Sequence, residues 1–227
     1  NTYSIGSDPN GNTTAGQGKT KYDADVRSEL ITSWEAGAEL KFFNNRLGVD
    51  FAWYKTNAKR QLMNIPLNNL SGYDNMKVNA GNIQNTGIEI MLNARPIETT
   101  QFSWDTQLNF SQNKSKIIEL LPGKPGMQYA LGGSDALQVY AVAGGAYGEI
   151  WGTKYQRVEE GEFKGQLLLN ESGLPQATSD KHKIGEQQPD FLLGWTNTFN
   201  YKNFTLSFLI DGRFGGDIFS FTNMNFQ

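Results

Sequence analysis

The sequence has no cysteine and only one histidine, His182. Without cysteine there is no disulfide scaffold, no thiol nucleophile and no thiolate ligand for a metal. With a single histidine and no thiol, neither a zinc site nor a histidine-based catalytic triad is expected. The composition therefore argues against the common kinds of catalytic centre.

The chain also lacks an excess of basic residues and a long apolar run. Its 20 Lys and Arg are balanced by 23 Asp and Glu, a net charge of −3, so no basic stripe is available for phosphates and nucleic-acid binding is not expected. The sequence shows no signal-peptide pattern after Asn1. No run approaches the roughly 18 apolar residues of a membrane-spanning helix. This excludes helical spans only, because a transmembrane β-strand hides its apolar residues at every second position.

The strongest positive signal is alternation. From Thr32 to Phe42, apolar residues occupy every second position and polar or small residues occupy the others. A strand places these two sets on opposite faces, whereas a helix would scatter both around its circumference. Five further segments alternate in the same way, and each is longer than the ~5–6 residues common in soluble sheets. The six predicted strands cover about residues 32–43, 46–56, 86–96, 102–113, 191–201 and 204–215.

The connections between these strands alternate in length. Short connections at about residues 44–45, 96–101 and 201–203 are separated by long ones at about 56–86 and 114–190. Transmembrane barrels have short periplasmic turns, long outer loops and aromatic girdles at the membrane interfaces. Aromatic residues gather at the short-turn ends here, namely Phe42, Phe43, Phe102, Trp104, Phe199, Tyr201 and Phe204. The sequence therefore predicts an all-β, antiparallel, up-and-down transmembrane barrel segment with long extracellular loops.

Six strands are too few for a closed membrane barrel, whose smallest form has about eight. Because lipid does not tolerate open sheet edges, we expect the chain to be part of a larger barrel. Two other interpretations stay open. A secreted soluble β-sandwich that binds glycans through its aromatic residues also explains the alternation, but not the strand lengths and the one-sided loops together. In the other interpretation, the chain is a purely structural part of a larger complex.

Short motifs follow one another over about residues 29 to 218. They are Trp34–Glu39, Phe42–Leu47, Asn79–Glu89, Asn109–Asn113, Ile184–Gly185 with Pro189–Asp190, Gly194–Asn197, Tyr201–Phe204 and Asp211–Gly216. Each is degenerate alone, but as an ordered series they resemble the C-terminal barrel portion of the SusC/RagA family, the TonB-linked outer-membrane receptors of Gram-negative bacteria. Since the motifs fall on predicted strands and turns, we interpret their residues as determinants of the fold rather than as ligand contacts.

The resemblance implies that the six strands belong to a TonB-dependent transporter barrel of about 22 strands. It also implies import of oligosaccharides or peptides across the bacterial outer membrane. A SusD-like surface lipoprotein would act as a lid, and the TonB complex would supply energy. The family's plug, N-terminal extension and TonB-contacting segment are not found in the sequence, so no coupling residue is assigned.

Three local motifs suggest chemistry but are weak. Gly16–Thr20 looks like a phosphate-binding loop, yet the required first glycine would fall at Thr13. Asp8–Asn12 carries oxygen ligands in the wrong pattern for a helix–loop–helix calcium site, which leaves only irregular calcium binding in the outer loops open. The acidic residues of Glu159–Glu162 flank a glycine, as at a solvated hairpin tip. We therefore expect no enzyme, no catalytic residue and no resident cofactor.

The long connection at 114–190 carries the candidate contact residues. We expect its segments 149–158 and 163–170 to form a hairpin outside the membrane. Exposed aromatic rings stack on sugars and hold peptides. The aromatic residues here are Tyr129, Tyr140, Tyr147, Trp151 and Tyr155. The candidates for contact with substrate or lid are Tyr140, Tyr147, Trp151 and Tyr155, with packing of the loop against itself as the alternative for each.

Overall fold

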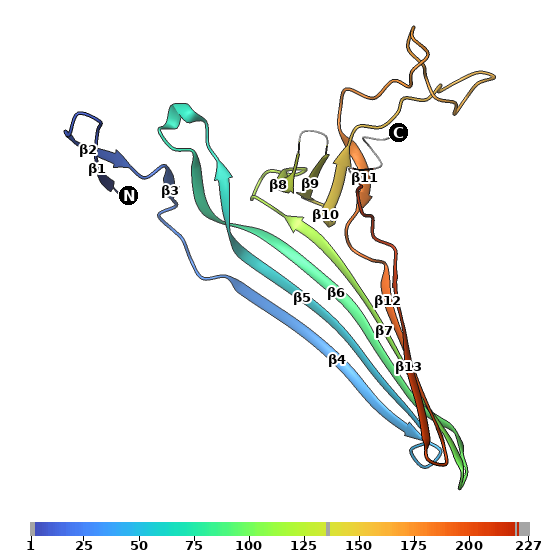
Figure 1. Ribbon diagram of the computed structural model, residues 1–227. Helices are drawn as coiled ribbons and strands as arrows, with labels where there is room; N and C mark the ends of the chain where they lie inside the picture. Colours follow the sequence, from blue (N-terminus) through green and yellow to red (C-terminus); the bar gives the residue numbers. More distant parts are fainter. Residues whose placement is uncertain (1–2, 135–136, 221, 223–227) are drawn as a thin grey trace.

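A computed structural model describes residues 3–134, 137–220 and 222 (Figure 1). Apart from a short 3₁₀-helix at Asn69–Ser71, the secondary-structure elements named in the described ranges are strands. None of the helices in the described ranges has the length and apolar character needed to cross a membrane. The strands are β1 (Tyr3–Ser7), β2 (Thr13–Gln17), β3 (Thr20–Tyr22), β4 (Leu30–Phe42), β5 (Leu47–Pro66), β6 (Asn75–Glu98), β7 (Phe102–Glu119), β8 (Gln128–Gly133), β9 (Leu137–Val142), β10 (Tyr147–Gly152), β11 (His182–Glu186), β12 (Phe191–Tyr201) and β13 (Phe204–Phe214).

The strands form three sheets. The largest, which we call the wall sheet, has the order β13-β12-β7-β6-β5-β4, with β3 added in parallel beside β6. The second, the loop sheet, has the order β11-β10-β9-β8, and β1 and β2 form a separate hairpin. The six predicted strands correspond to β4, β5, β6, β7, β12 and β13. All of these pair with their neighbours in antiparallel fashion.

The predicted long connection at 56–86 is wrong. Strands β5 and β6 stay paired as far as Pro66 opposite Asn75, and only the stretch 67–74 joins them. These strands contain 20 and 24 residues, and β7 contains 18. Just beyond the predicted ends, polar residues lie on both faces, as at Lys59–Gln61 in β5 and Gln84–Asn85 in β6, and they interrupt the alternation by which a strand is recognised in the sequence.

The register separates the wall into two faces. One row across all six long strands is apolar and runs Leu40, Val49, Leu92, Leu108, Trp195 and Ile210. The row one residue away is polar or small except for Met91 and runs Glu39, Asp50, Met91, Asn109, Gly194 and Asp211. The alternation predicted from the sequence is therefore continuous across the sheet.

The apolar face is uncovered. Leu40 is 51% exposed and Leu206 is 62% exposed, and within the described residues no second sheet packs against these side chains. A soluble β-sandwich would bury this face against its partner sheet. The sandwich interpretation is therefore wrong, and the face has the character of a lipid-contacting surface.

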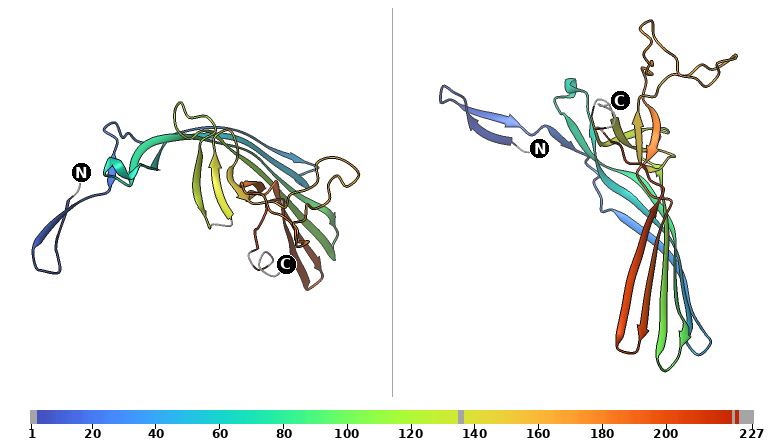
Figure 2. Two further views of the ribbon diagram at one scale, coloured as in Figure 1. Left: turned by 90° about the horizontal axis from the view of Figure 1, so that it is seen from above. Right: turned by 45° about the vertical axis from the view of Figure 1, so that its right-hand side comes forward.

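The wall sheet is curved, and the loop sheet lies on its concave side at the end of the long connections (Figure 2). Ile117 and Leu120 at the outer end of β7 are fully buried together with Ala141 of β9. Ile117 lies on the same face as Asn113 and Gly87, which is the polar face of the wall. The small apolar core therefore lies where the loop sheet meets the wall, and the polar face is the concave one.

At the opposite end, the short turns bring aromatic rings together. The rings of Trp104 and Phe199 stack with 5.7 Å between centroids, and Phe102 lies 6.4 Å from Phe199. The indole Nε1 of Trp104 donates a hydrogen bond of 3.0 Å to Oδ1 of Asn197. The structure thus contains an aromatic cluster at the short-turn end, as the sequence predicts for a girdle at the membrane interface.

The predicted hairpin of 149–158 and 163–170 is only partly correct. Strand β10 pairs with β9 and β11 instead. The following residues, 153–180, form an arm that projects from the loop sheet (Figure 1). Isolated bridges, among them Arg157 opposite Leu167, and backbone hydrogen bonds such as that from the N of Val158 to the O of Gln166 (2.9 Å) hold this arm.

Candidate functional site

Two of the four candidate aromatic residues lie together on the loop sheet. Tyr140 of β9 and Trp151 of β10 meet edge to face, with ring centroids 6.2 Å apart and an interplanar angle of 86°. This is one of the favoured geometries of an aromatic pair. Both rings are partly exposed. The pair is therefore ordered by its own contact and still accessible to another molecule.

The other candidates are spread over the outer region. Tyr147 begins β10 and is 39% exposed, while Tyr155 lies in the arm and is 58% exposed. Tyr155, Arg157 and His182 line a hollow of about 1210 Å³ in the arm. Tyr129 instead packs against the core around Ile117. The structure therefore does not gather all of these aromatic side chains into one site.

The sequence did not identify Glu149 as a member of this region. Its side chain accepts three hydrogen bonds: Oε1 from the backbone N of Ala146 (3.3 Å) and Nζ of Lys183 (3.0 Å), and Oε2 from Nε1 of Trp151 (3.0 Å). Glu149 is 5% exposed. Nζ of Lys183 also reaches Oε2 of Glu186 at 3.2 Å. A charge is buried at tolerable cost when it is paired and hydrogen-bonded in this way.

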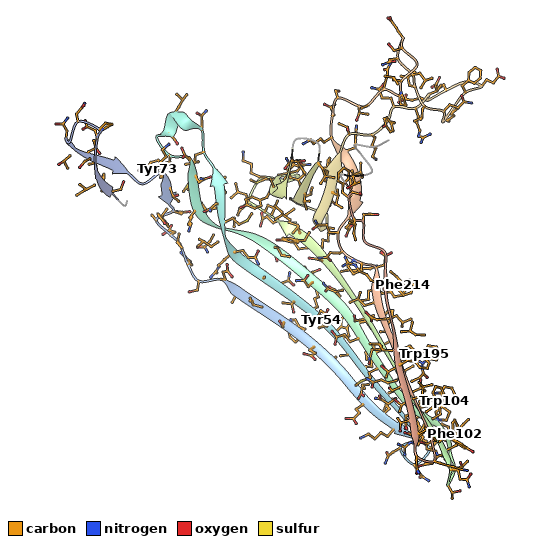
Figure 3. All side chains as sticks on the ribbon, in the orientation of Figure 1. Tyr54, Tyr73, Phe102, Trp104, Trp195 and Phe214 are labelled. Carbon is orange, nitrogen blue, oxygen red and sulfur yellow. The ribbon has the colours of Figure 1, made fainter. Side chains whose placement is uncertain are left out.

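The concave face of the wall carries two hollows with charged side chains in their lining. One, of about 690 Å³ at mid-height, is lined by carboxylates of four strands together with apolar groups. These carboxylates belong to Glu39, Asp50, Glu89 and Asp211. The other, of about 440 Å³, lies near the short turns and holds ion pairs of Arg95 with Asp105 (2.6 Å) and with Glu98 (3.1 Å). Figure 3 shows the side chains along the wall, with Tyr54 at mid-height and Phe102 near the turns. The face is suited to contact with water and polar solutes.

The weak local motifs have structural roles. Gly16 lies in β2, paired with Ser4 of β1, so a phosphate-binding loop is excluded. The Asp8 carboxylate accepts hydrogen bonds from Asn10 and Asn12 within its own turn. The bond from the Asn12 side chain, followed by the backbone bonds, lowers the pKa of Asp8 from its ordinary value. No cluster of three His, Asp or Glu side chains suited to a metal occurs in the described ranges. Calcium in the outer loops stays a prediction.

A family model described as the β-barrel of TonB-dependent receptor-like proteins matches residues 1–211. The chain belongs to this family. The membership confirms the resemblance identified from the motifs, the β-barrel fold class and the bacterial outer membrane as the location. Members of this family are receptors and transporters rather than enzymes.

Two curated relatives and one solved structure illustrate the similarity. The TonB-dependent receptor SusC of Bacteroides thetaiotaomicron is 29% identical over 199 residues, which cover 82% of this chain and 19% of that one. TonB-dependent receptor P3 of Formosa agariphila is 29% identical over 214 residues, covering 87% and 21%. The RagAB peptide importer in its open-open state superimposes with a TM-score of 0.73 at 17% identity, covering 95% and 24%. The chain thus spans about a fifth of the length of these curated relatives.

Proposed function

We propose that this chain forms part of the wall and outer loops of a transporter that imports oligosaccharides or peptides together with a SusD-like surface lipoprotein. Energy would come from the TonB complex. The observation that carries the proposal is the position of the loop sheet, which lies on the polar, concave face of the wall at the end of the long connections (Figure 2). Cargo entering from this end meets the loop sheet first and the polar wall afterwards.

The edges of the wall sheet support a longer parent protein. Strands β4 and β13 end the strand order of the wall sheet on either side in the described part of the chain. Both carry exposed apolar residues on the convex face, Leu40 and Leu206 among them. Because unpaired backbone groups are not tolerated in the hydrocarbon region, further strands would pair with these edges and close the barrel.

Tyr140, Tyr147, Trp151 and Tyr155 are the proposed contacts for cargo or for the lipoprotein. All four lie in the outer region, between the outer end of β7 and the start of β12. Aromatic rings with a polar group present an apolar body and a hydrogen-bonding tip, which suits both sugar rings and peptide side chains. Both cargo classes therefore stay within the proposal.

The test uses the parent receptor in its native bacterium. An affinity tag allows its purification from the outer membrane in mild detergent, and mass spectrometry identifies what accompanies it. We expect a surface lipoprotein in near-equal amount, and loss of cargo uptake in a strain without TonB. A receptor that purifies without a lipoprotein and takes up cargo independently of TonB would refute the proposal.

A further inference from the structure

The carboxylate of Glu149 is buried outside the barrel wall, in a part of the molecule made of thin sheets and loops. It is one of two buried polar residues in the part of the chain that the structure describes, the other being Asn197. The loop sheet has a small apolar core and gains little from burial alone. A buried carboxylate needs several hydrogen-bond donors to offset its loss of water. Each of those donors is in turn fixed in position by its bond to the carboxylate.

The first group that Glu149 fixes is the indole of Trp151. Oε2 of Glu149 accepts the Nε1–H bond at 3.0 Å, which sets the rotation of the indole plane. The same plane meets Tyr140 edge to face. In the register of the loop sheet Glu149 lies directly opposite Tyr140, so the carboxylate and the two rings share one face. The orientation of the aromatic pair therefore depends on Glu149.

The second group is the turn between β9 and β10. Oε1 of Glu149 accepts a bond from the N of Ala146, and a β-carbon on Gly145 would lie only 2.5 Å from this oxygen. The same turn is bonded to the wall, since the N of Gly144 donates to the O of Ile117 (2.8 Å) and the N of Ile117 donates to the O of Gly145 (2.9 Å). One carboxylate thus holds the turn by which the loop sheet attaches to β7.

The third group is Lys183 of β11, whose ammonium bonds to Oε1 of Glu149 at 3.0 Å. Lys183 lies opposite Trp151 in the pairing of β10 with β11, although the whole arm at 153–180 lies between them in sequence. Lys183 also binds Glu186 at 3.2 Å, but that pair is more exposed and contributes less. Glu149 therefore ties β11, the turn and the aromatic pair together.

We propose that Glu149 is a positioning residue that locks the loop sheet onto the barrel wall and fixes the Tyr140–Trp151 pair in the geometry that contacts cargo. The cargo contact rests on the proposed function, whereas the locking stands on the hydrogen bonds alone. If Glu149 is replaced by glutamine, the three donors face an amide that has only one acceptor oxygen. The turn then detaches from the sheet while the wall strands stay paired.

The test is hydrogen exchange of the parent receptor purified from the outer membrane, with Glu149→Gln and the matched control Glu186→Gln. The control removes the same charge from the same ion-pair cluster without touching Trp151 or Ala146. In Glu149→Gln we expect the amides of the turn 143–146 and of Ile117 to exchange at least about tenfold faster, with the control within about twofold of wild type. The amides of Trp104–Leu108 in the wall should not change in either variant.

Equal exchange in wild type and Glu149→Gln would overturn the proposal, as would equal acceleration by Glu186→Gln. Glu149→Asp keeps the charge but withdraws the carboxylate by one methylene, so it decides the question by the same criterion if Glu149→Gln is not recovered folded.

Uptake of a labelled peptide digest and of labelled malto-oligosaccharides gives the second readout. A rise in the half-saturating concentration at unchanged maximal rate supports positioning, and an unchanged value overturns the cargo contact. If wild type takes up neither probe, import of malto-oligosaccharides and of these peptides by the receptor is refuted, while the exchange result still decides whether Glu149 locks the loop sheet.

Discussion

The ring of Tyr54 occupies the space in which Gly87 would carry a β-carbon. The two residues are directly opposite on β5 and β6, and a β-carbon on Gly87 would lie 2.3 Å from Cζ and Oη of Tyr54. The Tyr54 hydroxyl reaches across Gly87 to Oδ1 of Asn113 on β7 at 3.3 Å. One side chain therefore bridges three strands of the wall because the middle strand has no side chain at that point.

Gly87→Ala should destabilise the barrel. The new methyl group meets the Tyr54 ring and also the backbone O of Gln112 at 2.7 Å, so the ring must leave its place. Overpacking of this kind costs about 1–3 kcal/mol. The measurement is thermal unfolding of the parent receptor, followed by its change of migration on gels. Gly48→Ala is the control, since its β-carbon would meet only ordinary contacts of 3.9 Å with Asn93. An equal effect of both substitutions would contradict the role of Tyr54.

Arginine on the convex face should impair assembly. Leu40 and Leu92 lie in the apolar row, whereas Glu39 and Asn93 lie one residue away on the concave face. Leu40→Arg or Leu92→Arg should cost about 2–4 kcal/mol if the position is near the bilayer midplane. Glu39→Arg and Asn93→Arg should be tolerated, because their side chains face water. The amount of folded parent receptor in the outer membrane measures the effect, and similar losses on both faces would disprove the assignment of the faces.

These two relationships show what the sequence pattern can and cannot reveal. Alternation places Leu40 and Glu39 on opposite faces directly, because each strand carries its own pattern. The fit of Tyr54 on Gly87 depends on the register between β5 and β6, which a single strand does not contain. The outer halves of these strands were missed for a related reason. Polar residues on both faces at Lys59–Gln61 and Gln84–Asn85 interrupt the alternation, and the pairing of Pro66 with Asn75 shows that the strands continue.

The candidate site was predictable to a similar extent. The aromatic residues of the loop sheet were visible in the sequence, and Tyr140 and Trp151 do lie together. Glu149 was not, because a lone glutamate in a loop is normally exposed. Its burial depends on Lys183, which the chain brings to β10 only after the whole arm. The one sequence signal was spacing, since Glu149 and Trp151 are two residues apart and must share a face of any strand.

Asn79→Asp should release the segment that precedes β4. The Asn79 amide accepts a hydrogen bond from the N of Arg27 and donates to the O of Arg27 (2.8 Å) and of Arg60 (2.8 Å). An aspartate keeps the acceptor, but it faces two carbonyl oxygens without a donor, a loss of about 1–3 kcal/mol. Limited proteolysis should cleave residues 23–29 faster. Asn82→Asp is the control, because its Oδ1 only accepts a bond from Asn57, and faster cleavage in both variants would rule out the donor role of Asn79.

The loop sheet should lose part of its stability at alkaline pH. Partial burial acts to lower the pKa of Lys183, but the hydrogen bonds to Glu149 and Glu186 outweigh it and raise the pKa above its ordinary value of 10.5. A raised pKa means that the folded state binds the proton of Lys183 more tightly than the unfolded state does. The contribution of the Lys183 ammonium to the stability of the loop sheet is therefore complete below about pH 10 and is lost as the pH rises through the pKa of the folded state. Lys183→Met lacks this contribution at every pH. Cleavage of the loop sheet by subtilisin should therefore be slower in wild type than in Lys183→Met near neutral pH, and the difference should shrink above about pH 10. A difference that grows with rising pH would show that the ammonium does not stabilise the sheet.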